Sequence, residues 1–281
     1  SLLTETALYR YATPRFYTVD EFPESYRDFT VSTFYPNPWK GGWWRLADAV
    51  AYCLTASRAV LTTAANYRAE LLYDKYQMGR DTIARFRKEP PYAWIIPAAP
   101  WDAPTAALML EKPRLNGIRV FASERSFTSD GLSYPAGTWV VPMVQPFALF
   151  AKAMFEEQKY PDLTQYPDAW QGLVAPQRFK DAYLPPYDMA GWTLPYQFGV
   201  KAVAANSPLD IPLLPLDRVA PPAARAEGVG AAWVISPKLN SAFTAVNRIL
   251  KQGGEVHRSR EPLTVGADTL PPGAFVVSKG L

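Results

Sequence analysis

The fold class is decided by residues 91–121, PYAWIIPAAPWDAPTAALMLEKPRLNGIRVF. The apolar run YAWII is followed by a predicted helix and then by a second short apolar run, GIRVF. Asp102 stands where a helix N-cap is expected, and Pro104 lies in the first turn, where a missing backbone N–H has no cost. A strand, a helix and a strand in this order are typical of an α/β fold.

The same pattern returns later in the chain. AWIIP at 93–97 matches AWVIS at 232–236 at a spacing of 139 residues, and YPAGTWVV at 134–141 matches LPPGAFVV at 270–277 at a spacing of 136. Because even the turn residues agree, the pattern favours a duplication over two independent solutions to one steric problem. The sequence therefore predicts two copies of a strand, helix, strand, turn, strand unit. A helix is predicted after the first copy, and we expect the second copy, which stops at Leu281, to be truncated.

A long helix is predicted in the first part of the chain. No glycine or proline lies between Gly42 and Gly79, and apolar or small residues recur there at alternating steps of four and three. The predicted buried stripe consists of Leu46, Val50, Cys53, Ser57, Val60, Ala64, Tyr67 and Leu71. On this stripe Cys53 is expected to be a buried, inert thiol, and Gly79 is expected to mark a helix break.

Three parts of the chain are expected. They are residues 1–72, residues 73–219 and residues 220–281, with the second copy of the repeat in the last part. The proline- and tyrosine-rich stretch 160–219 is interpreted as a long ordered connection, and APPAARAEG at 220–228 as a flexible joint.

Composition excludes several classes of function. The formal charge of +3 comes from interleaved signs, so it does not indicate a nucleic acid or an anionic membrane as a partner. The longest uncharged stretch, 131–151, is interrupted by prolines and does not predict a membrane span. One cysteine excludes a disulfide framework, and one histidine excludes a histidine-rich metal site built from this chain alone.

Few residues qualify for chemistry. His257 ends a predicted strand and is interpreted as an edge or surface residue. GGWW at 41–44 precedes a helix and could seat an anion, although tryptophans that anchor the loop to the core are the simpler reading. No GxGxxG or GxxxxGK[ST] motif is present. Strand ends could still form a binding crevice, with loops after Ile96, Val141 and Ile235 and with Ala98, Asp102 and Gln145 lining it.

Long phrases of the sequence resemble one known family. LTETA at 3–7, YPNPWKGGWWRLADAV at 35–50, AELLYDKYQMGRD at 69–81 and the stretch 91–121 are similar to the latter part of large bacterial zinc metallocarboxypeptidases of the carboxypeptidase A type. In those proteins a class I glutamine amidotransferase-like region follows the peptidase domain. The resemblance implies the tail of a carboxypeptidase-type α/β domain, a strand plus a long closing helix, followed by a Rossmann-like, amidotransferase-like α/β region.

The resemblance implies a role for one residue, Glu5. In the family a glutamate at this place is the general base on zinc-bound water and passes the proton to the leaving amine. Read without the resemblance, Glu5 is an ordinary exposed strand residue. The family's zinc ligands precede the base, but only four residues precede Glu5 here, and His257 is the sole histidine. Zinc is thus implied for the intact protein, and this chain alone is expected to bind none.

The resemblance also implies a peptide or peptidoglycan-type substrate and a periplasmic or secreted location, although the sequence opens without a signal peptide. A glutaminase would need a cysteine elbow and a histidine followed by a glutamate, and this chain has neither, so the amidotransferase-like region is expected to be non-catalytic. Two hypotheses follow. The chain is the C-terminal portion of a zinc metallocarboxypeptidase-like protein, inactive alone, or it is a non-catalytic α/β binding or scaffold module in which Glu5 is structural.

Overall fold

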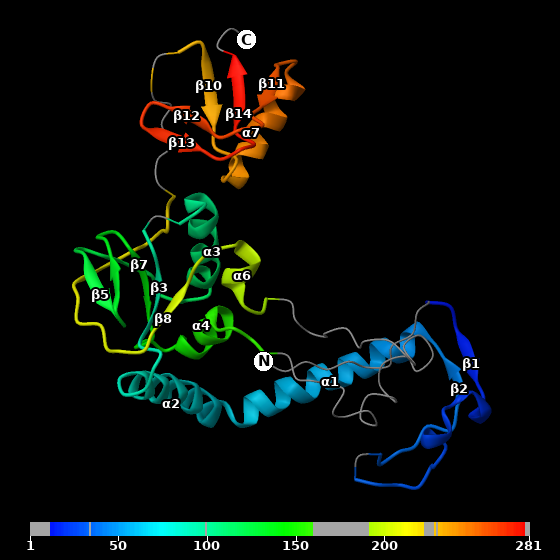
Figure 1. Cartoon of the computed structure of the whole chain (residues 1–281). Coiled ribbons are helices and arrows are strands. Elements are labelled where there is room, and N and C mark those ends of the chain that lie inside the picture. Colours follow the sequence, from blue (N-terminus) through cyan, green and yellow to red (C-terminus); the bar gives the residue numbers. More distant parts are fainter. Residues whose placement is uncertain are drawn as a thin grey trace. The chain divides into compact units, whose positions relative to one another are not determined.

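The structure, a computed structural model, describes residues 12–33, 35–98, 100–159, 191–221, 228 and 230–278 (Figure 1). The chain divides into two compact units, Ser1–Tyr76 and Gln77–Leu281. Glu5, the predicted general base, lies outside the described residues, as does most of the predicted joint at 220–228. No helix in the described ranges is long and apolar enough to cross a membrane.

The first unit opens with a small aromatic cluster. Strand β1 (Arg15–Tyr17) pairs antiparallel with β2 (Gly42–Trp44), and the short helices η1 (Val19–Glu21) and η2 (Glu24–Tyr26) lie between them in the sequence. The Trp39 ring lies 5.7 to 5.8 Å, centroid to centroid, from the rings of Tyr17, Phe22 and Trp44. Aromatic side chains therefore hold this segment together.

The long helix is present, but it ends earlier than predicted. Helix α1 (Leu46–Asn66) begins with the Asp48 carboxylate accepting the Arg45 backbone N–H at 2.7 Å, and it ends at Tyr67, where α2 (Arg68–Phe86) follows. The predicted break at Gly79 is wrong, because this glycine lies inside α2 and its cost of about 1 kcal/mol in a helix is tolerated.

The predicted burial of the stripe is also wrong for α1. No residue of α1 is buried, Leu46 is 57% exposed and Val50 is 58% exposed. Cys53 is a free, exposed thiol and not a buried one. An amphipathic pattern predicts an apolar helix face that is buried against another element. Among the described residues, none buries this face of α1.

The second unit contains a five-stranded sheet in the order β8-β3-β7-β4-β9. Its strands are β3 (Ala93–Ile96), β4 (Phe121–Ser123), β7 (Trp139–Pro142), β8 (Val203–Ala205) and β9 (Leu213–Pro215). All its pairs are antiparallel, as are the other strand pairs in the described part of the chain. The region is thus mixed α/β, but it does not show the mostly parallel sheet that a Rossmann-like fold would have.

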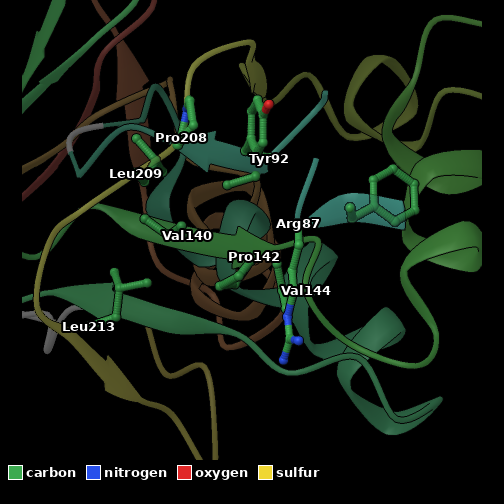
Figure 2. Close-up of a pocket in the computed structure, with 10 residues that line it drawn as sticks. Arg87, Tyr92, Val140, Pro142, Val144, Pro208, Leu209 and Leu213 are labelled. Carbon is green, nitrogen blue, oxygen red and sulfur yellow. The ribbon is translucent and has the colours of Figure 1, made fainter. Parts of the chain in front are cut away.

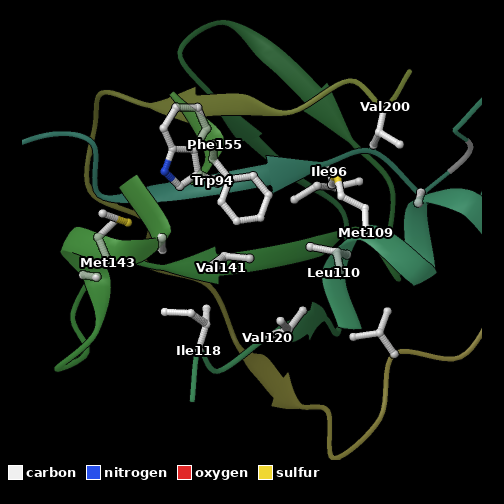
Figure 3. Packing of buried hydrophobic residues seen from close by; sticks show 14 of the residues in the cluster. Trp94, Ile96, Met109, Leu110, Ile118, Val120, Val141, Met143, Phe155 and Val200 are labelled. Carbon is white, nitrogen blue, oxygen red and sulfur yellow. The ribbon is translucent and has the colours of Figure 1, made fainter. Parts of the chain in front are cut away.

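Each face of this sheet carries an apolar layer. Trp94 and Ile96 point to the inner face, where α3 (Ala103–Leu115), α4 (Ala148–Phe155) and α6 (Leu194–Phe198) supply the core (Figure 3). The Trp94 ring stacks on Phe155 at 5.9 Å.

The outer face is the side to which Ala93, Ile95 and Val140 point. There β5 (Phe127–Ser129) and β6 (Leu132–Tyr134) form a hairpin that packs on the sheet.

The second copy has the same order of elements. They are β10 (Ala232–Ile235), α7 (Asn240–Lys251), β11 (Val256–Arg258), β12 (Leu263–Val265), β13 (Asp268–Leu270) and β14 (Phe275–Ser278). Strands β10, β14 and β11 form a three-stranded sheet with β14 in the middle, as β7 lies between β3 and β4.

The strand registers of the two copies agree residue by residue at the spacings found in the sequence. Ala93 faces Pro142 and Ala232 faces Ser278, while Phe121 faces Val140 and His257 faces Val276.

The turn before the last strand agrees as well. The Gly137 N–H donates to the Ser123 carbonyl at 2.8 Å, and the Gly273 N–H donates to the Ser259 carbonyl at 2.9 Å. Both glycines have a positive φ, of +80° and +93°, which other residues rarely adopt.

Candidate functional site

The residues predicted to line a crevice are largely structural. Asp102 is buried and caps α3, as predicted: its carboxylate accepts the backbone N–H of Thr105 at 3.0 Å and the Thr105 hydroxyl at 2.7 Å. The same carboxylate accepts the backbone N–H of Asn240 at 2.8 Å, at the start of α7. Because the Asp102 carboxylate accepts these hydrogen bonds at the starts of α3 and α7, it has a structural role at two helix ends and not a ligand-binding one.

The side-chain amide of Gln145 is also used in structural hydrogen bonds. Its side-chain oxygen accepts the Arg119 backbone N–H at 2.8 Å, and its amide nitrogen donates to the carbonyls of Arg119 and Pro142. The side chain is 1% exposed and ties β7 to the segment before β4. Ala98, the third predicted lining residue, is half-buried. Ala98 and Asp102 follow the end of β3 that pairs with Trp139, whereas Gln145 follows β7 at the opposite end of this antiparallel pair, so the three residues do not form the predicted crevice.

The residues considered for metal or nucleophilic chemistry are dispersed. His257 lies exposed on β11, which is an edge strand, as predicted, and Glu255 Oε2 is 3.9 Å from its Nε2. Within the ranges that the structure describes, no three His, Cys, Asp or Glu residues group as metal ligands. The described side chains therefore do not fit a zinc site. Cys53 has no activating partner among the described residues.

The GGWW motif is part of the aromatic cluster of the first unit. Trp43 packs edge-on against Phe16 at 5.5 Å, and Trp44 lies 5.6 Å from the Tyr52 ring. The tryptophans anchor the turn before α1, which is the simpler of the two interpretations of the motif.

A cavity of about 220 Å³ lies at the outer face of the five-stranded sheet (Figure 2). Its walls are mainly apolar, and Arg87 and Tyr92 are the only polar side chains among its lining residues. The lining consists of Phe86, Arg87, Tyr92, Ala93, Val140, Pro142, Val144, Pro208, Leu209 and Leu213. Figure 2 shows Leu209 and Leu213 across the cavity from Arg87.

The two polar side chains of the cavity, Arg87 and Tyr92, differ in whether they are free to bind a ligand. The Tyr92 hydroxyl donates to the Lys88 carbonyl at 3.0 Å, so its hydrogen is already used. Arg87 lies just after α2 and is exposed, with its permanent positive charge at an apolar wall. No lining residue is a carboxylate, thiol, imidazole or aliphatic hydroxyl. The arrangement can bind an anion with an apolar tail, and its lining offers no nucleophile or general base.

A carboxylate fixes the loop that forms one wall. Asp130 accepts the backbone N–H of Asn206 at 2.7 Å and the Ser207 hydroxyl at 2.8 Å, just before Pro208 and Leu209. These hydrogen bonds hold the pKa of Asp130 below its ordinary value. Burial, together with the negative charge of Asp130, raises the pKa of Tyr134.

Sequence reasoning did not find this cavity. Arg87 follows α2, Val140 belongs to β7, and Leu209 lies between β8 and β9, so the lining comes from segments more than 50 residues apart. Patterns within a short stretch of sequence cannot predict that such distant segments lie side by side.

Comparison of the chain with protein-family models, with curated proteins and with solved structures finds no match.

Proposed function

We propose that the α/β region, residues 77–278, is a non-catalytic binding module whose cavity takes a small anion with an apolar tail. The observation that carries the proposal is the pairing of one cation, Arg87, with an apolar cavity whose lining holds no catalytic group. Small-molecule sites are typically apolar concavities with a few polar groups that fix orientation. The volume of about 220 Å³ limits the tail to a few carbon atoms.

The test is a titration of the whole chain with unbranched carboxylates from acetate to hexanoate, followed by calorimetry or by amide chemical shifts. Affinity should rise with each methylene until the cavity is filled, since each buried CH₂ contributes about 0.8 kcal/mol. The alcohol of equal length should bind more weakly because it lacks the charge.

Arg87→Gln should remove the preference for the carboxylate over the alcohol. Arg85→Gln is the matched control, because Arg85 lies two residues away and pairs with Glu89 at 2.9 Å. If both variants bind the carboxylates as the parent chain does, the cavity is not the site.

A second proposal concerns the first unit. We propose that it is the tail of a metallocarboxypeptidase-type domain, with Glu5 as general base in the intact protein and a peptide or peptidoglycan-type substrate outside the cytoplasm. The exposed apolar face of α1 supports this, because a closing helix separated from its sheet would present such a face. Zinc would have to be held by residues upstream of Glu5.

That proposal is tested with a protein that includes the upstream coding sequence. It should hydrolyse C-terminal residues from peptides in the presence of zinc, and Glu5→Gln should abolish turnover while zinc content stays the same. Full activity of Glu5→Gln, or an upstream sequence without a His-x-x-Glu motif, would contradict it.

A further inference from the structure

In the first copy, one segment closes the sheet at both of its edges. Residues 203–215, hereafter the clasp, supply β8, which pairs with β3, and β9, which pairs with β4. Between the two strands the clasp crosses the outer face, where Leu209 and Ile211 pack on the apolar side chains of the sheet and the hairpin. The clasp thus satisfies two strand edges and covers one apolar face.

The second copy has a sheet of the same arrangement, but no described segment pairs with its two outer strands. Strands β10 and β11 correspond to β3 and β4, and among the described residues both are edge strands. Strands at the edge of a sheet present rows of backbone N–H and C=O groups that can accept another strand.

The outer face of the second copy is correspondingly uncovered. The register assigns each outer-face residue of the first copy a counterpart in the second: Ala93 and Ala232, Ile95 and Val234, Phe127 and Leu263, Tyr134 and Leu270, Val140 and Val276. All five members of the first set are buried, whereas all five counterparts are only half-buried. These five pairs lie on the face that the clasp crosses; on the inner face, too, Trp233 is more exposed than Trp94.

We propose that this face and the two edges of the second copy form a docking site for an extended polypeptide segment of the clasp type. The partner supplies one short strand to β10 and one to β11, joined by a stretch that lays aliphatic side chains on Leu263 and Leu270. Backbone hydrogen bonds provide the affinity, and the apolar face selects the crossing side chains.

Charge defines the partner further. Residues 230–278 carry five lysines and arginines against three aspartates and glutamates. The clasp in the first copy carries a single charge, that of Asp210. A segment that is aliphatic and neutral to acidic is therefore complementary to the second copy. Gly266 stands where the first copy has Asp130, so the partner needs no counterpart of the Asn206–Ser207 anchor.

The probe is a synthetic peptide of residues 201–216, KAVAANSPLDIPLLPL, added to the full chain. Hydrogen–deuterium exchange should slow in β10 and β11 on binding and stay unchanged in β3 and β4, whose edges are already paired. The control peptide has the same side chains but N-methylated backbones at Val203, Ala204, Ala205, Leu213 and Leu214. It should bind at least about tenfold more weakly, because it has lost several backbone donors.

A pair of variants locates the site on the protein. Leu263→Glu places a charge on the outer face and should abolish binding, whereas Thr264→Glu, on the next residue of β12 and the opposite side, should not. Far-ultraviolet circular dichroism verifies that both variants are folded. If Leu263→Glu fails to fold, Leu270→Ser on β13 replaces it.

Three results would overturn the proposal: no saturable binding of the probe, equal binding of the N-methylated peptide, or binding without protection of β10 and β11. The carboxylate titration of the first copy's cavity is independent of all three, so the two proposals can fail separately.

Discussion

The carboxylate of Asp130 and the backbone N–H of Asn206 lie 2.7 Å apart across 76 residues of sequence. This bond joins the turn between β5 and β6 to the start of the crossing segment that carries Leu209. Asp130 thus ties the hairpin on the outer face to the segment that crosses it, in addition to the pairing of β8 with β3 and of β9 with β4.

The bond predicts a pH dependence of stability. Hydrogen bonds to the charged form lower the folded-state pKa of Asp130 below the ordinary 3.8. The stabilisation is therefore complete above pH 3.8 and is lost as the pH falls through the lower, folded-state value. Asp130→Asn should be less stable than the parent at pH 7, and the difference should shrink below pH 3.8. Urea unfolding at several pH values measures this, with exposed Asp210→Asn as control; a constant difference at all pH values would contradict it.

Two tryptophans at corresponding positions should differ in their contribution to stability. Trp94 is 7% exposed and stacks on Phe155, whereas Trp233 is 38% exposed. Trp94→Ala should lower the free energy of unfolding by about 3–5 kcal/mol, as expected for a buried aromatic residue, and Trp233→Ala by a smaller amount. Denaturant unfolding of both variants provides the measurement. Equal losses would show that the two copies bury this position to the same extent.

Asp102→Ala should destabilise the second unit by about 1–3 kcal/mol, because it removes the cap of α3 and leaves the Asn240 N–H without its acceptor. Asp102→Asn keeps one carbonyl oxygen and should cost less. Thermal unfolding of the two variants distinguishes these roles. If the alanine variant is as stable as the parent chain, the Asp102 cap does not contribute to the free energy of unfolding.

The exposed face of α1 predicts rapid proteolysis. Limited digestion should remove residues before about Tyr73 faster than it cuts the unit that begins at Gln77, because α1 buries none of its side chains. Mass spectrometry of the fragments identifies the cut sites. Equal resistance of the two units would indicate that another segment protects α1.

The same face should bind a hydrophobic dye. Val50→Ser and Leu61→Ser, both on exposed positions of α1, should lower the fluorescence of bound anilinonaphthalene sulfonate without changing helix content. Leu214→Ser, an exposed leucine of β9 in the other unit, is the matched control and should leave most of the signal.

Local features of the sequence predicted local features of the fold. The runs AWIIP and AWVIS became β3 and β10, and Asp102 caps the helix that its position indicated. These signals are readable because alternation, capping and turn chemistry act over a few residues.

What the sequence could not predict depends on contacts between distant segments. Nothing near Val203 or Leu213 indicates that they pair with Ile95 and Ser123, which lie 108 and 90 residues earlier, so the antiparallel five-stranded sheet and its cavity were not foreseen. For Cys53, periodicity predicted a face that could be buried, but it could not supply the partner that would bury it.

The shared turn of Gly137 and Gly273 has a consequence for engineering. Because the two copies share the same backbone hydrogen bond and a positive φ at this bend, a chimera that exchanges the segments 124–142 and 260–278 should keep the pairing of the last strand. Side chains can then be substituted on either copy while the turn that the two copies share is kept.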